Sequence, residues 1–192
     1  MEAQALTGGF RDPARDAAHA FRSVMEAMAR PGELRDIAGA EPPEPMSVAA
    51  GAVILTLCDT DTPVYLAGAL DCDAIRQWIA FHTGAPLVGP SQCMFALGAW
   101  NALLPLSPYP LGTSQYPDRS ATLIVEMDTL APEGAALSGP GIKAEAALSL
   151  PDVAAFAANR KHFPRGLDFI FTSARKLAAL PRTTRVTAQE AG

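Results

Sequence analysis

The stretch LIVEM, residues 123–127, is the clearest strand signal in the chain. It is a short apolar run with β-branched residues, and turn-forming residues bound it, which is typical of a buried strand. A second strand is predicted over Leu167 to Phe171. The second run lies between two segments with helical patterns, which favours a sheet that helices cover.

Further short strands are predicted on either side of these two runs. They cover Val64 to Ala67, Cys93 to Leu97, Lys143 to Leu148 and Thr184 to Thr187. The sequence LSGPGI, residues 137–142, predicts a tight turn because glycine and proline punctuate it. The stretch from Ala102 to Pro117 holds four prolines and is predicted as a long irregular crossing.

The first helix has a well-defined start and end. Asp12 is a suitable N-cap and Pro13 fits the first helical position, where its missing N–H costs nothing. Apolar residues then recur at helical spacing until Pro31 and Gly32 end the helix. A buried helix over Val48 to Leu57, capped by Ser47, is favoured next, although a strand remains an alternative there.

Helical patterns also follow later in the chain. They run from Asp71 to Phe81 with Gly84 beyond the end, from Pro151 to about Arg160, and as a short helical turn over Ala174 to Ala179. Strands alternate with helices early and cluster later. The predicted class is therefore α/β, a single three-layer α/β/α domain over residues 1–192 with a mixed sheet, helices on both faces and a disordered tail from about residue 188.

The composition is poor in charge. Apolar residues make up 49% of the chain and charged residues 18%, against a usual share of about 25%. Two interpretations stay open. Part of the surface is covered by a partner, because exposed apolar patches mark interfaces, or the composition is simply rich in alanine.

Charge is also unevenly distributed. The net charge is −5, yet seven basic and only two acidic residues lie from Arg160 onward. This asymmetry favours an anion or an acidic partner at the C-terminal third, with scattered solvated side chains as the alternative. Because the whole chain is acidic and has no long basic stripe, nucleic acid is not expected as a ligand.

The cysteines and the apolar runs indicate the cellular setting. Cys58, Cys72 and Cys93 form no CxxC pair, so free thiols in a reducing cytoplasm are expected, without a zinc site. No apolar run reaches the roughly 20 residues that a membrane span needs. We therefore expect a cytoplasmic protein without contact to a membrane.

Three short motifs carry weak signals of chemistry. His82 could act as a general base, but no matched nucleophile lies near it in sequence, and a structural role at a helix end is favoured. Asp59-Thr60-Asp61 resembles half of a metal site, although a turn cap is the simpler interpretation. Ser138 to Gly141 could form an anion-binding nest of amides, with a tight turn as the default.

Four arginines are the candidate interface or anion-binding residues. Arg165 lies between Pro164 and Gly166 before a strand, and the others are Arg119, Arg182 and Arg185. The planar guanidinium suits carboxylate and phosphate groups, within one chain or across an interface. Internal pairing is the favoured alternative, for example with Asp118 or Asp168. The residues alone indicate no catalytic residue, cofactor or metal ligand.

An ordered set of motifs spans most of the chain. FRSVMEAMARPG, LCDTDTPVYL, HTGAPL, YPDRSAT, LSGPGI, FPRGLDFIF and LPRTTRV follow one another from Phe21 to Val186. In this set the chain resembles the H subunit of the carbon–phosphorus lyase core complex of bacterial phosphonate breakdown. The resemblance implies a fold similar to pyridoxal-phosphate-dependent transferases without that cofactor. It also implies a homodimer, and a place beside the G, I and J subunits.

The resemblance implies a function in a reaction sequence. The G, H, I and L subunits together join a phosphonate to the ribose of ATP with loss of adenine, and the J subunit then breaks the C–P bond. Only Lys143, Lys161 and Lys176 are available for a Schiff base here, and no catalytic residue carries over. The other hypothesis is a free-standing anion-binding protein or small-molecule enzyme that uses the C-terminal arginines.

Overall fold

The computed structural model describes residues 7–188. Its main sheet has six strands in the order β1-β8-β7-β4-β3-β2. The strands are β1 (Arg35–Asp36), β2 (Val64–Leu66), β3 (Phe95–Ala99), β4 (Thr122–Glu126), β7 (Asp168–Ser173) and β8 (Lys176–Leu180). Strands β2, β3, β4 and β7 are parallel, β8 is antiparallel to β7, and β1 is antiparallel to β8. The predicted mixed sheet is confirmed.

A second, three-stranded antiparallel sheet has the order β6-β5-β9. Its strands are β5 (Ala135–Ser138), β6 (Ala146–Leu148) and β9 (Arg185–Thr187). The turn predicted over residues 137–142 is therefore too long, because Leu137 and Ser138 still pair with Val186 and Arg185. The strand predicted from Lys143 begins only at Ala146.

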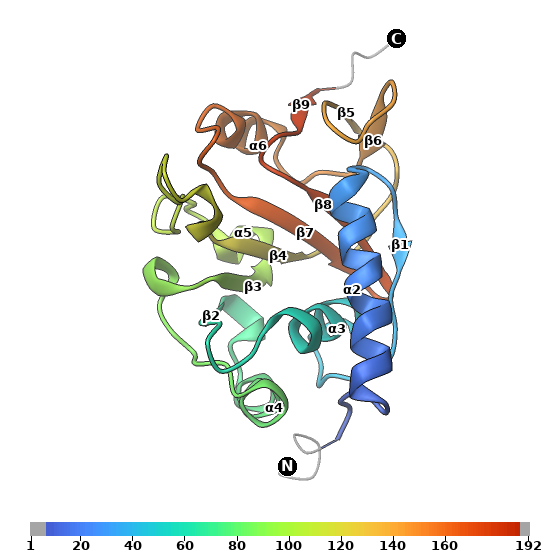
Figure 1. The fold of residues 1–192 in the computed structure, drawn as a ribbon, viewed down its shortest axis with the longest axis vertical. Helices are drawn as coiled ribbons and strands as arrows, with labels where there is room; N and C mark the ends of the chain where they lie inside the picture. The colour runs from blue at the N-terminus through green and yellow to red at the C-terminus, as the bar shows by residue number, and fades with distance from the viewer. Residues whose placement is uncertain (1–6, 189–192) are drawn as a thin grey trace.

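The main sheet lies between two groups of helices (Figure 1). Helices α2 (Pro13–Ala29), α3 (Val48–Leu57) and α4 (Asp73–Thr83) pack on one face, and α5 (Trp100–Leu103) and α6 (Val153–Arg160) on the other. Short 3-10 turns are η1 (Gly68–Leu70), η2 (Pro90–Gln92) and η3 (Pro117–Arg119). Helices on both faces, as predicted, give the α/β class.

Local capping explains the helix boundaries. The Asp12 side chain accepts a hydrogen bond from the Arg15 amide, and the Ser47 hydroxyl accepts one from the Ala50 amide. The helix favoured for Val48 to Leu57 is thereby confirmed. Gly84 ends α4 in the left-handed conformation with φ of 69°. Helix α4 begins at Asp73, two residues later than predicted.

The central strands are buried on both faces and divide the core into two clusters. In the register of β4 and β7, Ile124 pairs with Ile170 and faces α2, α3 and α4. Leu123 pairs with Phe169 and faces α5 and α6. On that second face the Phe156 ring of α6 contacts Trp100 and Phe169, with ring centres 4.8 and 4.9 Å apart.

The helical turn predicted over Ala174 to Ala179 is wrong. Residues Lys176 to Leu180 form strand β8, which pairs with β7 through a tight turn. Ala174 occupies the left-handed region in this turn, with φ of 51°, which alanine rarely adopts. In β8 the last four residues, 177–180, are all buried, because the strand is covered on both faces. Tertiary packing thus overrides the helix propensity of the two alanines. The tail predicted as disordered falls, from residue 189 onward, outside the described residues.

Glu126 joins the end of β4 to the start of α3. Its Oε1 accepts a hydrogen bond of 2.7 Å from the Ser47 amide, across 79 residues of sequence. Burial raises the pKa of the Glu126 carboxyl, and the bond from Ser47 offsets only part of that rise. The protonated form is therefore stabilised by folding. Its contribution to stability is full below the ordinary pKa of 4.5 and is lost as the pH rises through the raised value.

We expect Glu126→Gln to match the wild type in unfolding free energy near pH 4 and to exceed it at pH 8. Glutamine keeps the acceptor for Ser47 and carries no charge. Urea unfolding at a series of pH values measures this difference. Glu126→Ala is the control, and it should be about 1–3 kcal/mol less stable than Glu126→Gln at both pH values because the Ser47 amide loses its acceptor. A Gln variant less stable than the wild type at pH 8 would contradict the argument.

Candidate functional site

Three of the four candidate arginines lie near the edge of the sheet where β4 and β7 begin. Arg119 ends η3 just before β4, and Arg165 lies just before β7. Arg182 lies just after Pro181, beyond the end of β8, and β8 runs back to the same edge. The antiparallel return of β8 therefore brings the end of the sheet's last strand to the start of its central ones. Arg185 begins β9 in the second sheet.

Arg182 is fully engaged within the chain. Its Nε lies 3.2 Å from both carboxylate oxygens of Asp168, and its Nη2 also contacts that carboxylate. Its Nη1 donates a bond of 2.6 Å to the Pro117 carbonyl, and its Nη2 donates to the Ser120 hydroxyl. The Asp168 and Arg182 side chains are only 16% and 13% exposed. Arg182 is therefore paired within the chain, which was the favoured alternative. Its guanidinium connects β7 and the end of β8 to the segment just before β4.

The other three arginines stay accessible and do not meet at one point. The Arg119 guanidinium lies over the Tyr116 ring, 4.2 Å from its centre. Arg165 and Arg185 are exposed, and within residues 7–188 no ion pair involves any of the three. The geometry does not bring the four arginines together as one anion site. Their role at an interface stays a prediction.

A cleft that sequence reasoning missed lies near this edge. It has a volume of about 630 Å³ and opens between the proline-rich stretch 104–111 and helix α6. Its walls are mainly apolar and include Leu106, Ala155 and Leu167, with His162 also lining it. The stretch 104–111 carries no charge and has no regular period, so the only signal in the sequence was its three leucines between prolines.

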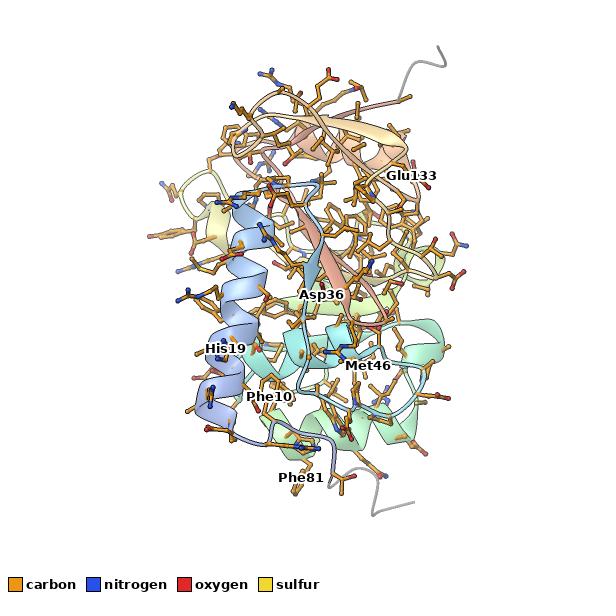
Figure 2. All side chains as sticks on the ribbon, turned by 90° about the vertical axis from the view of Figure 1, so that its right-hand side faces the viewer. Phe10, His19, Asp36, Met46, Phe81 and Glu133 are labelled. Carbon is orange, nitrogen blue, oxygen red and sulfur yellow. The ribbon has the colours of Figure 1, made fainter. Side chains whose placement is uncertain are left out.

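The outward side of α2 forms a second unusual surface, here called the α2 outer face and made of Ala14, Ala18, Phe21, Met25 and Ala29. Phe21 is 48% and Met25 54% exposed. The residues of α2 that are buried against the core are Ala20, Val24 and Ala27. At about 100° per residue they lie on the opposite side of the helix. His19, labelled in Figure 2, is exposed on a third side of α2.

The three weaker motifs take structural positions. His82 Nε2 lies within 3.1 Å of the Thr7 carbonyl oxygen, and the imidazole contacts the rings of Trp78 and Phe81. Phe10 and Phe81 lie at this same end of the molecule (Figure 2). Asp59 caps its own turn by accepting from the Asp61 amide. Gly139 accepts from the Ile142 amide in a tight turn. Across residues 7–188, no three His, Cys, Asp or Glu side chains gather as metal ligands.

Cysteine and lysine chemistry is unfavourable in the described part of the chain. The three cysteines are free, as predicted. Burial raises the pKa of Cys58 to about 12 and that of Cys93 to about 11, so both thiols are protonated at neutral pH. The three lysine side chains, Lys143, Lys161 and Lys176, are exposed and lie on three different segments. An exposed lysine does not fit the enclosed Schiff-base site that a pyridoxal enzyme requires.

Fold and surface together define an α/β protein whose accessible features are apolar faces beside unpaired basic side chains, which is typical of a subunit of an assembly. No helix within residues 7–188 is long and apolar enough to span a bilayer. Residues 8–187 match the family model described as bacterial phosphonate metabolism protein (PhnH). The chain therefore belongs to the PhnH family, and the resemblance inferred from the motifs is confirmed.

Two relatives have names that describe their roles. One is the alpha-D-ribose 1-methylphosphonate 5-triphosphate synthase subunit PhnH of Rhizobium meliloti (strain 1021). The chain is 43% identical to it over 196 residues, which cover 96% of this chain and 97% of the relative. The other is the C-P lyase subunit protein HtxG of Stutzerimonas stutzeri, 29% identical over 175 residues, which cover 87% and 84% of the two chains. Both relatives are thus named as subunits.

We expect Arg182→Ala to lower the unfolding free energy by about 3–5 kcal/mol, because Asp168 would remain as a largely buried carboxylate without its partner. Arg165→Ala removes a solvent-exposed arginine from the same edge and should change stability by about 0.5 kcal/mol or less. Urea unfolding of the two variants beside the wild type measures the contrast. Equal losses in both variants would show that Arg182 does not hold this edge together.

Proposed function

We propose that this protein is a subunit of the bacterial enzyme complex that joins a phosphonate to the ribose of ATP, with loss of adenine, before the C–P bond is broken. The observation that carries the proposal is 43% identity, along nearly the whole chain, to a relative named as a synthase subunit. We further propose a cytoplasmic location and assembly with the G, I and J subunits. The chain acts within the complex and has no activity alone.

The structure supports a subunit role in a second way. Within residues 7–188 no metal-ligand cluster is present, the buried thiols are protonated and the lysines are exposed. Apolar surface is instead accessible at the α2 outer face and in the cleft beside α6. Surfaces of this kind favour contacts with other protein chains over chemistry on a small molecule.

The alternative function is a free-standing anion-binding protein or small-molecule enzyme that uses the C-terminal arginines. It requires several guanidinium groups to converge on one ligand. Arg182 instead donates its hydrogen bonds to Asp168, Pro117 and Ser120, while Arg165 and Arg185 lie on separate segments. The subunit role is therefore the better supported of the two.

We also infer that the isolated chain forms a homodimer through the α2 outer face. The stripe residues Ala18, Phe21 and Met25 are spaced by three and four, which suits helix-to-helix packing along a seam. In an antiparallel pair around a two-fold axis near Phe21, Ala18 of one copy would meet Met25 of the other. A small residue then lies opposite a large one, as close packing of two helices requires.

Deletion of the gene for this protein should stop growth of its host on an alkylphosphonate as sole phosphorus source while growth on phosphate continues. The reason is that a complex lacking one subunit cannot carry out the first step. Growth curves on the two phosphorus sources measure this, and a plasmid copy of the wild-type gene should restore growth on phosphonate. Unimpaired growth of the deletion strain on phosphonate would refute the proposed function.

The double variant Phe21→Glu, Met25→Glu should convert the isolated dimer into a monomer, since four new carboxylates would replace apolar contacts and would repel one another across the two-fold axis. Light scattering at micromolar concentration gives the mass of each species. His19→Glu places one new carboxylate on another side of α2 and should leave the dimer intact. A wild-type protein that is monomeric at this concentration would contradict the inference.

A further inference from the structure

The cleft beside α6 is preformed. Its outer wall, the stretch 104–111, is anchored at its end because Pro110 accepts from the Ala121 amide at 2.8 Å and Leu111 accepts from the Gly166 amide at 3.0 Å. Tyr109 of this wall is buried in the core. Neither wall therefore has to fold before a ligand can enter, which lowers the entropic cost of binding.

The interior of the cleft offers few polar groups. The amide of Asn159 is the most buried of them, and both of its polar atoms are used by Leu167, in two bonds of 2.9 Å. Besides Asn159, the polar side chains that line the cleft are Ser107 and His162. A small polar metabolite would find almost nothing to fix its orientation there, whereas apolar side chains of a protein would be well accommodated.

The segment after α6, which forms the rim of the cleft at His162, is basic. His162 lines the cleft, Lys161 and Arg165 are its exposed neighbours in sequence, and none of the three takes part in an ion pair within the described chain. This segment is attached to the opposite wall through the bond from Gly166 to Leu111. Asp168, the next acidic residue along the chain, is neutralised by Arg182. Carboxylates of a ligand would therefore meet uncompensated positive charge at the rim.

Two large apolar side chains are exposed here. Leu104, which lines the cleft, is 40% exposed, and Phe163, in the basic segment after α6, is 50% exposed. The Arg160 guanidinium lies 4.8 Å from the centre of the Phe163 ring and donates to the Thr183 carbonyl, which holds this part of the rim in place. Apolar anchors inside a polar border are the usual anatomy of a protein–protein contact.

We infer that this cleft binds an acidic, amphipathic segment of a partner subunit, with apolar side chains in the cleft and carboxylates against Lys161, His162 and Arg165. The inference rests on the proposed function, because it assigns a surface to one contact within the complex. A second copy of this chain fits less well. In a two-fold contact the same rim would face itself, and like charges would oppose each other.

The test uses the full chain, tagged and co-expressed with the other subunits of the complex. A photo-crosslinking amino acid replaces Ser107, which lines the cleft and is exposed, and mass spectrometry identifies the attached peptide. We expect a peptide of another subunit that carries Asp or Glu beside apolar residues. Attachment to a peptide of this same chain, or to a peptide without acidic residues, would overturn the inference.

Two variants separate the roles of the rim and the interior. Lys161→Glu with Arg165→Glu should weaken binding to the partner roughly tenfold at low salt, and the defect should shrink as salt rises. Ala158→Tyr narrows the apolar interior and should weaken binding at every salt concentration. The matched control is Arg175→Glu with Lys176→Glu, an equal change of charge at the turn between β7 and β8, which should bind normally.

The outcomes distinguish the two levels of the proposal. Circular dichroism first confirms that each variant is folded. If the wild-type chain assembles and both cleft variants bind as tightly as it does, the cleft inference fails while the proposed function stands. If the wild-type chain joins no other subunit and its deletion leaves growth on phosphonate intact, the proposed function fails and takes the cleft inference with it.

Discussion

Strands β4 and β7 pair in parallel, with Leu123 beside Phe169 and Ile124 beside Ile170, and the rest of the structure depends on this contact. Parallel neighbours cannot be joined by a tight turn, so the chain must cross between them. That crossing carries β5, β6 and α6, and α6 covers one face of the sheet. The other face requires its own cover, which α2, α3 and α4 provide. Both apolar clusters of the core follow from this one pairing.

The pairing also decides what Arg182 can do. Because β8 returns antiparallel beside β7, the end of β8 reaches the edge where Asp168 begins β7. A carboxylate at this edge needs a cation, and Arg182 supplies it while also binding the carbonyl of Pro117 before β4. A guanidinium used in this way holds three segments together. Arg165, on the segment after α6, keeps its charge available to other molecules, as do Arg119 and Arg185.

Local signals predicted the parts of the fold that depend on few residues. The caps Asp12 and Ser47, and the strand around Ile124, could be read directly because each rests on neighbours in sequence. Strand β8 could not, because its two alanines favour a helix and only the partner strand and the two covering layers make it extended. A pairing of Asp168 with an arginine was foreseen, but which arginine it would be depends on how β8 returns.

The apolar cleft escaped prediction for a different physical reason. Its walls come from residues 104–111 and from α6, about fifty positions apart, and each wall alone looks like ordinary apolar sequence. The low share of charged residues indicated apolar surfaces without locating them, because a high alanine content lowers that share as well. The structure shows where the alanines and the exposed apolar residues lie.

Small residues such as Ala49, Ala50 and Ala52 are fully buried in α3, so they serve close packing in the core. Large apolar side chains nevertheless remain outside, as Phe21, Met25 and Leu104 show. Leaving large apolar groups in water costs free energy that a monomer does not recover. Their position on α2 and at the mouth of the cleft is best explained by other chains that cover them.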